Sequence, residues 1–184
     1  MKTDKYLQGL SLKVSPLGEN DRLLTLLSNE EGITRLAVPG ARKPKSKLAA
    51  AAPLTYLELH IGGRSALQSV RHIKILRSYS KVGQQLETLA AAQSIAELSL
   101  LLVAGNDPLP GMLDTVLMHL ERLEKTEGEG SMNTVFTLAK SVQSCVHLLA
   151  LGGYGLPIQR CCLSGLPLEP PIGNWDWKCS LIPD

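Results

Sequence analysis

A cluster of cations lies in the segment PGARKPKSKLAAAAP, residues 39–53, between two predicted β-strands. Arg42, Lys43, Lys45 and Lys47 fall within six positions, and no acidic residue interrupts them. Flexible cationic side chains of this kind bind the phosphate backbone of a nucleic acid without reading its bases. The segment therefore predicts a phosphate-binding loop. A solvated loop without a partner is the alternative interpretation.

The distribution of charge along the chain favours the first interpretation. Residues 1–86 hold 14 Lys and Arg against 6 Asp and Glu, a net charge of +8, whereas residues 87–184 hold 5 against 11, a net charge of −6. Between Glu31 and Glu87, Glu58 is the only acid, and it stands against ten cations. Such a division predicts a basic nucleic-acid-binding part joined to an acidic part. Further candidate contacts to phosphate are Arg22, Arg35, Arg64, Arg71, Lys74 and Arg77.

Motifs for catalysis are absent from the sequence. It contains no Gly-rich phosphate loop that ends in Lys-Ser or Lys-Thr, and no His-Glu-x-x-His. The four histidines are scattered along the chain, and each is predicted to be a surface or satisfied residue rather than a catalytic base. We therefore expect a protein that is not an enzyme. These histidines are His60, His72, His119 and His147.

Three cysteines near the C-terminus are weak candidates for a metal site: Cys161, Cys162 and Cys179. A structural zinc site normally uses two Cys-x-x-Cys pairs. Here Ser164 and Ile182 stand three positions after Cys161 and Cys179. The pattern favours ordinary thiols over bound zinc, and no other cofactor is expected.

Aromatic residues that stack bases are few in the basic part of the chain. Tyr6, Tyr56 and Tyr79 lie there, and Tyr56 is predicted to be a core or rim residue. Single-strand binders commonly stack bases on aromatic rings. With little of that, we expect binding that is dominated by the phosphate backbone and tolerant of sequence.

Five short segments of alternating or apolar pattern, separated by turns, predict β-strands. Five strands within about 75 residues are typical of a small barrel, and the length fits the OB-fold, whose strands and loops bind nucleic acid. The predicted strands are residues 5–14, 23–27, 33–38, 54–61 and 67–76.

The second half of the chain predicts helices at 82–104, 112–125 and 132–151. The first is apolar nearly all round, so we expect a central, buried helix. The third is expected to pack through one apolar side, and Gly152 and Gly153 end it. Together with the barrel, these helices give an α+β chain. The side of the third helix that is expected to be buried consists of Val135, Phe136, Ala139, Val142, Val146 and Leu149.

No apolar run reaches the roughly 18 residues of a membrane-spanning helix. The N-terminal segment MKTDKYLQGL has no apolar region of the kind found in secretory signals. The sequence predicts a soluble, cytoplasmic protein without a membrane partner.

Four stretches, taken in order, resemble the RecO family of bacterial recombination mediators. The resemblance implies an N-terminal OB-fold domain at 1–79 and a helical domain at 80–184, whose tail is a degenerate form of the family's zinc finger. The chain ends earlier than is usual in the family, so we expect a helical domain that is incomplete at its C-terminus. The stretches are LGENDRLLTLLSNEEG at 17–32, GARKPKSKL at 40–48, LAAAQSIAEL at 89–98 and LLALGGYGLPIQRC at 148–161.

The resemblance also implies a function without chemistry. Proteins of this family bind single- and double-stranded DNA, anneal complementary strands and, with RecR, assist the loading of RecA at the nucleoid. They also bind the acidic C-terminal tail of the single-strand-binding protein, through the helical domain. An RNA-binding accessory barrel and a protein-interaction adaptor are the alternatives that the charge pattern leaves open. The residues that match the family's basic loop are Arg42, Lys43, Lys45, Ser46 and Lys47, with Arg35 on the preceding strand.

Overall fold

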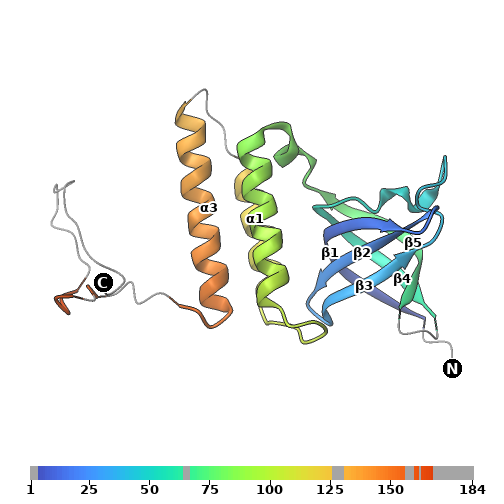
Figure 1. Ribbon diagram of the computed structural model, residues 1–184, viewed down its shortest axis with the longest axis horizontal. Helices are drawn as coiled ribbons and strands as arrows, with labels where there is room; N and C mark the ends of the chain where they lie inside the picture. The colour runs from blue at the N-terminus through green and yellow to red at the C-terminus, as the bar shows by residue number, and fades with distance from the viewer. Residues whose placement is uncertain (1–3, 64–66, 126–130, 156–159, 162, 168–184) are drawn as a thin grey trace.

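The protein consists of a β-barrel with a layer of helices beside it (Figure 1). The structure is a computed structural model, and it describes residues 4–63, 67–125, 131–155, 160–161 and 163–167. Strands come first and helices second along the chain, so the predicted α+β architecture is confirmed.

Five strands close the barrel in the order β1-β2-β3-β5-β4, and β4 pairs back onto β1. Neighbouring strands are antiparallel except for β3 and β5, which run parallel. A closed five-stranded barrel of this kind confirms the predicted OB-type fold. The strands are β1 (Lys5–Leu17), β2 (Asp21–Ser28), β3 (Gly32–Val38), β4 (Thr55–Gly62) and β5 (Gln68–Ser78).

Alternating side chains fill the inside of the barrel. Leu57, Leu59 and Ile61 of β4 are fully buried, whereas the side chains of Glu58 and His60 between them are partly exposed. Successive residues of a strand point to opposite faces, so one set forms the core and the other set the outer surface. Each buried aliphatic side chain contributes about 1.5–3 kcal/mol to folding. The inner set also includes Leu7, Leu24, Leu26, Leu36, Val38 and Val70.

The connection from β3 to β4 contains a short 3₁₀ helix, η1 (Lys47–Ala50). Ala41 and Ala51, on either side of this helix, are buried in the barrel core, and Leu48 packs against them. The connection is therefore anchored to the barrel by its apolar residues.

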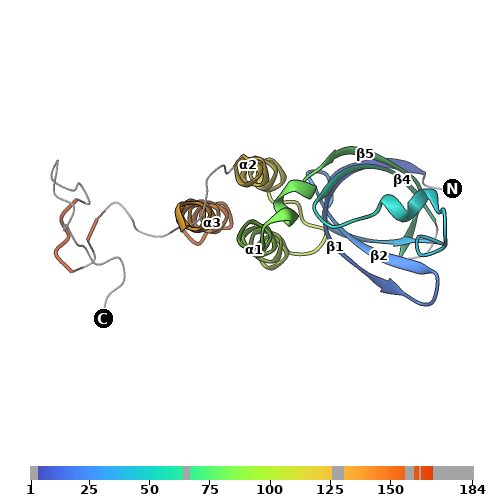
Figure 2. The ribbon, with the colours of Figure 1, turned by 90° about the horizontal axis from the view of Figure 1, so that it is seen from above.

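The helical part begins with a second 3₁₀ helix, η2 (Ser80–Gln84), followed by α1 (Leu86–Leu102), α2 (Met112–Glu124) and α3 (Ser131–Leu151). Figure 2 shows α1 and α2 beside the barrel and α3 on their far side. One apolar cluster joins the barrel to the helices. It includes Leu10, Leu12, Leu27 and Tyr79 of the barrel side together with Ala92, Ile95, Val116 and Leu120 of the helices.

Helix α1 is shorter than predicted and is not buried all round. Residues 82–84 belong to η2, where the hydroxyl of Thr88 donates a hydrogen bond of 2.7 Å to the carbonyl of Val82. Leu86 and Leu101 are largely exposed, because the barrel, α2 and α3 leave part of the helix surface open. The central position of α1 between the barrel and the other helices agrees with the prediction.

The predicted packing side of α3 is wrong. Thr137, Ser144 and Leu148 are buried, whereas Val135, Phe136 and Val142 are about half exposed or more. Just past the end of α3, a Cβ atom at Gly152 would lie 2.8 Å from the nearest Leu102 methyl carbon, so the chain approaches α1 closely there. The helix has apolar residues on more than one side, and close approach to α1 decides which side is buried.

Helix α3 is also long and apolar enough to cross a membrane by length and composition, over Thr134–Leu151. This window contradicts the expectation that no apolar stretch of the chain reaches such a length. A single helix of this kind is a weak indication of a membrane span, and here α3 packs against α1 and α2.

Candidate nucleic-acid interface

The loop predicted to bind phosphate is held by its apolar residues and presents its cations to solvent. Arg42, Lys43, Lys45 and Lys47 are all exposed. They lie between the residues that pack into the end of the barrel. The backbone thus fixes the base of each cation, while the charged ends stay free to reach a phosphate. The anchoring residues are Ala41, Leu48 and Ala51.

Hydrogen bonds join this loop to the turn between β1 and β2. The backbone N–H of Arg42 donates to the carbonyl of Asn20 over 2.9 Å, and its guanidinium donates to the carbonyl of Gly18 over 3.2 Å. A guanidinium carries five N–H donors, so Arg42 keeps donors for a ligand. The N–H of Gly40 donates to the carboxylate of Asp21 over 2.8 Å, so this amide is already satisfied.

Ser46 has a structural role within the loop. Its hydroxyl accepts a hydrogen bond of 3.2 Å from the backbone N–H of Leu48 and so caps η1. The preceding residue, Lys45, has a φ of +60°, which is uncommon for a residue other than glycine. Ser46 therefore helps to hold the unusual backbone that positions Lys45 and Lys47.

Arg22 converges with Arg42. The guanidinium of Arg22, from the start of β2, donates a hydrogen bond of 3.1 Å to the carbonyl of Ala51 and is thereby oriented at the end of the barrel. Both arginines line a hollow of about 450 Å³. Two guanidinium groups around one hollow form an arrangement that suits an anion such as a phosphate. The other lining residues are Val14, Ser15, Pro16, Ala52 and Pro53.

Arg35 lies apart from this hollow. It points outward from the middle of β3, in a row in which Lys13 pairs with Thr25 and Thr25 pairs with Arg35 across β1, β2 and β3. This row lines a larger, polar groove of about 820 Å³, which extends to the α1–α2 connection at Gly105 and Asn106. The sequence did not point to Lys13; strand register, once known, places it beside Arg35.

The ion pairs of the described residues engage three of the predicted cations, Arg71, Lys74 and Arg77, and leave the cations of the loop without an acidic partner. These pairs join Lys5 to Glu31, Arg71 to Asp4, Lys74 to Glu58, and Arg77 to Glu121 and Glu124. None includes Arg22, Arg35 or a cation of the loop. Positive charge at this end of the barrel is therefore not cancelled by a direct acidic partner. Arg64 lies outside the described residues.

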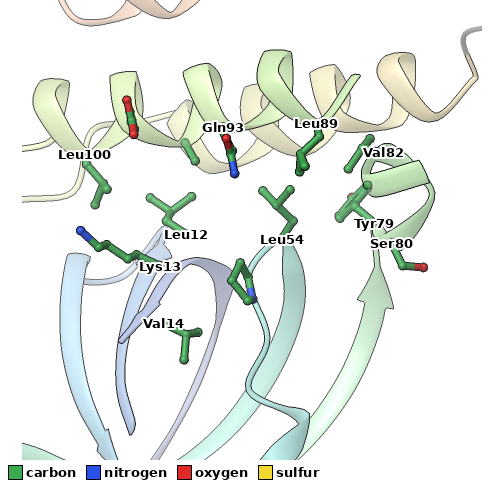
Figure 3. Close-up of a pocket in the computed structure, with 14 residues that line it drawn as sticks. Leu12, Lys13, Val14, Leu54, Tyr79, Ser80, Val82, Leu89, Gln93 and Leu100 are labelled. Carbon is green, nitrogen blue, oxygen red and sulfur yellow. The ribbon is translucent and has the colours of Figure 1, made fainter. Parts of the chain in front are cut away.

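A second hollow, of about 490 Å³, lies between α1 and the barrel (Figure 3). Leu12 and Leu54 point from the barrel toward Leu89 and Leu100 of α1, and Lys13 lies at the same junction. The hollow is therefore largely apolar, and its lining carries one cation, Lys13, and one acid, Glu97.

The histidines are less scattered in the structure than in the sequence. The Nε2 atom of His119 on α2 lies 3.2 Å from Nδ1 of His147 on α3. Burial, together with the neighbouring positive charges of His147 and Arg122, lowers the pKa of His119 to about 4. His119 is therefore neutral at physiological pH and belongs to the α2–α3 contact. The other two histidines, His60 and His72, stack on each other on the outer face of the barrel.

Of the three cysteine candidates, the structure describes Cys161. Cys161 lies in a turn in which its N–H donates to the carbonyl of Leu166 and its carbonyl accepts from the N–H of Gly165. Cys162 and Cys179 lie outside the described residues. Among the residues that are described, no group of three metal-binding side chains occurs.

The architecture and the surface define a class of protein: an OB-type barrel with an exposed cationic end, joined to a helical domain. Family models for "Recombination protein O N terminal" and "Recombination protein O C terminal" match residues 1–79 and 83–183. The chain therefore belongs to the RecO family of DNA repair proteins.

Individual relatives agree with this assignment. The "DNA repair protein RecO" of Prochlorococcus marinus (strain MIT 9303) is 66% identical over 184 residues, covering 100% of this chain and 69% of the relative. That of Synechococcus sp. (strain CC9311) is 60% identical, covering 100% of this chain and 71% of the relative. The protein of the same name from Trichodesmium erythraeum (strain IMS101) is 35% identical over 92% of this chain and 60% of the relative.

Proposed function

We propose that this protein binds single- and double-stranded DNA through the cationic end of its barrel and anneals complementary strands. The observation that carries the proposal is the shared hollow of Arg22 and Arg42 beside the exposed, unpaired Lys43, Lys45 and Lys47. Cations that contact phosphates release counterions and reduce the repulsion between two strands. Two strands held in this way are able to search for complementary bases. Arg35, and Arg64 on the β4–β5 connection, extend the contact, and Ser46 holds the loop.

The test is the affinity for a fluorescent single-stranded oligonucleotide, measured over a series of salt concentrations. Each phosphate contact that is lost lowers the slope of log affinity against log salt by about 0.7 for a single strand. Replacing Arg42, Lys43, Lys45 and Lys47 with Ala is therefore expected to lower the slope by about 2–3 and to abolish annealing. An unchanged slope and annealing rate would contradict the proposal.

Two double variants that remove the same number of cations show whether DNA affinity depends on where the cations lie or only on the total charge of the protein. Lys43→Ala/Lys45→Ala removes two cations from the loop, and Lys81→Ala/Lys125→Ala removes two exposed cations from the helical part. The first double variant is expected to lose affinity, and the second to bind as the wild type does. Competition with an RNA strand of the same sequence distinguishes a DNA mediator from an RNA-binding barrel. A DNA mediator is expected to prefer the DNA strand, and an RNA-binding barrel the RNA strand.

The protein partners form the second part of the proposal. With RecR, the protein assists RecA loading at the cytoplasmic nucleoid on strands coated by single-strand-binding protein; the RecR contact rests on family membership alone. The hollow between α1 and the barrel supports a site for the coating protein's acidic tail, because Leu12 and Leu54 offer apolar contact and Lys13 offers a cation. Glu97 lines the same hollow, so the acids of the peptide would have to lie on the Lys13 side of it.

The peptide site is tested by fluorescence anisotropy with that acidic tail peptide. Lys13→Glu is expected to weaken binding of the peptide about tenfold, because it replaces an attractive contact with the acidic peptide by a repulsive one at a partly enclosed site. Lys125→Glu, an equal change of charge at an exposed position away from the hollow, serves as the control. Equal binding by both variants would place the peptide elsewhere.

A further inference from the structure

Three aromatic rings form a row across the outer face of β1, β4 and β5. Strand register places Tyr6 opposite His60, and His60 opposite His72. The ring centroids of Tyr6 and His60 are 4.9 Å apart, and those of His60 and His72 are 5.8 Å apart. The interplanar angles are 21° and 6°, so the rings stand as one continuous stack.

The stack is not part of the core of the barrel. Tyr6 is 75% exposed, His72 is exposed, and His60 between them is half-buried. The neighbouring residues Leu7 and Leu59 point to the opposite side and form the buried interior. Tyr6 therefore contributes little to folding, and a large aromatic ring of this exposure is available to a ligand.

The ends of the stack are open. His60 is covered on both faces by its neighbours, but Tyr6 and His72 each have one face without a ring among the described residues. A planar ligand adds to a stack of parallel rings at an open end. The outer ring of Tyr6 is the more accessible of the two because of its high exposure.

Rows of polar residues border the stack on both sides. On one side Lys74 pairs with Glu58, with 3.6 Å between their charged atoms, and the Lys74 side chain is 70% exposed. On the other side Arg71 pairs with Asp4 above Gly62, where a side chain would collide with both. The acids are thus already paired with cations, so they do not leave a bare negative charge to repel a phosphate.

We propose that the open face of Tyr6 stacks a base of single-stranded nucleic acid. This inference rests on the proposed DNA-binding function and adds to it a contact on a second face of the barrel. Every nucleobase has a π-face, so stacking tolerates sequence, and it does not depend on counterion release. The stack lies on β1, β4 and β5, whereas Arg35 and Arg22 lie on β3 and β2. A strand on the cationic end and a base on the stack therefore occupy different surfaces of the barrel.

The test compares Tyr6→Ala with the wild type on a normal oligonucleotide and on an abasic one of equal length. On the normal strand, Tyr6→Ala is expected to lose about tenfold in affinity at every salt concentration, with the same salt slope. On the abasic strand the two proteins are expected to bind equally. Tyr6→Trp, which keeps a stacking ring, should restore the affinity. Tyr154→Ala removes another exposed tyrosine, beyond α3, and should have no effect.

The outcomes separate this inference from the proposed function. If Tyr6→Ala binds normal strands as the wild type does, the base-stacking site is wrong even where the loop variants lose their salt slope. An unchanged affinity accompanied by a change in oligomeric state would identify the row as a protein contact instead. Wild-type protein that binds no DNA overturns both proposals. Tyr6→Leu keeps apolar bulk without a π-face, and a loss of affinity in this variant at unchanged thermal stability excludes a folding defect.

Discussion

The guanidinium of Arg77 on β5 donates a hydrogen bond of 2.5 Å to the carboxylate of Glu121 on α2. A second donor of Arg77 lies 3.4 Å from Glu124, and the guanidinium carbon lies 4.8 Å from the centre of the Tyr79 ring. One side chain of the barrel thus contacts two acids of the helical part. Arg77 is therefore a polar link between the two parts, beside the apolar cluster that also joins them.

Replacing Arg77 with Ala is expected to reduce the free energy of unfolding by about 1–2 kcal/mol, because the pairs are only partly exposed and act together. Urea unfolding measures the change. Lys81→Ala removes an exposed cation three residues after the end of β5 and should stay within about 0.5 kcal/mol of the wild type. Equal stability of the two variants would mean that the Arg77 contacts contribute nothing.

The buried histidine on α2 predicts a loss of stability in mild acid. The pKa of His119 in the folded protein is about 4, below its ordinary value of 6.5, so between these pH values the unfolded chain binds more protons than the folded one. Stability therefore falls as pH falls from 6.5 toward 4, by up to about 3 kcal/mol. His119→Gln stays neutral and should show a weaker pH dependence in urea unfolding at pH 7, 6, 5 and 4.5. If the free energy of unfolding of the wild type and of His119→Gln changed with pH in parallel, His119 would not be the source of the pH dependence.

Two glycines with nearly the same φ angle allow the cost of steric crowding to be measured apart from the cost of backbone strain. Gly32 has a φ of +60°, and a Cβ atom there would lie 2.8 Å from the carbonyl oxygens of Gly105 and Asp107 in the α1–α2 connection. Gly18 has a φ of +62° and nothing within 4 Å of such an atom. Both Ala variants cost about 1–2 kcal/mol for the left-handed conformation.

Gly32→Ala should cost about 2 kcal/mol more than Gly18→Ala, since the β2–β3 turn must move away from the α1–α2 connection. The hydrogen bond of 2.8 Å from the N–H of Ile33 to the carbonyl of Gly105 would then be strained or lost. Thermal unfolding of the two variants measures the difference. A similar loss in both would show that the turn and the connection are free to separate.

The strands were predictable because burial imposes a period of two on them. In β4 the order of buried Leu57, Leu59 and Ile61 is visible in the sequence, and each predicted strand lies within or close to its observed counterpart. The buried side of α3 was not predictable in the same way. Periodicity identifies apolar sides, but the close contact at Gly152 depends on the position of α1.

The cluster of cations in the loop was apparent from the sequence, whereas the side chains that lie beside it in the folded protein were not. Arg22 and Arg42 lie 20 residues apart in the sequence and meet in one hollow only because β1–β2 and β3–β4 connections lie at the same end of the barrel. Arg35, predicted with them, lies in another groove. The row of Tyr6, His60 and His72 depends on strand register across β1, β4 and β5, which no local pattern shows.

Cooperation between the two arginines gives a further test of the shared hollow. If Arg22 and Arg42 contact the same phosphate, the losses in DNA-binding free energy for Arg22→Ala and Arg42→Ala should not add, and the coupling is expected to be about 1 kcal/mol. Arg35 lines the separate groove, so Arg35→Ala and Arg42→Ala should add to within about 0.5 kcal/mol. Anisotropy titrations of the single and double variants at one salt concentration measure both cycles.

Stability measurements of the same variants are needed because Arg22 also donates to the carbonyl of Ala51. Arg22→Lys keeps the charge while losing the planar fork, so it should retain most of the salt slope but bind less tightly than the wild type. Coupling in the Arg22–Arg42 cycle and additivity in the Arg35–Arg42 cycle would place one phosphate between the first two residues. The reverse pattern would move the phosphate to the groove of Arg35 and Lys13, and the loop would then act through its charge alone.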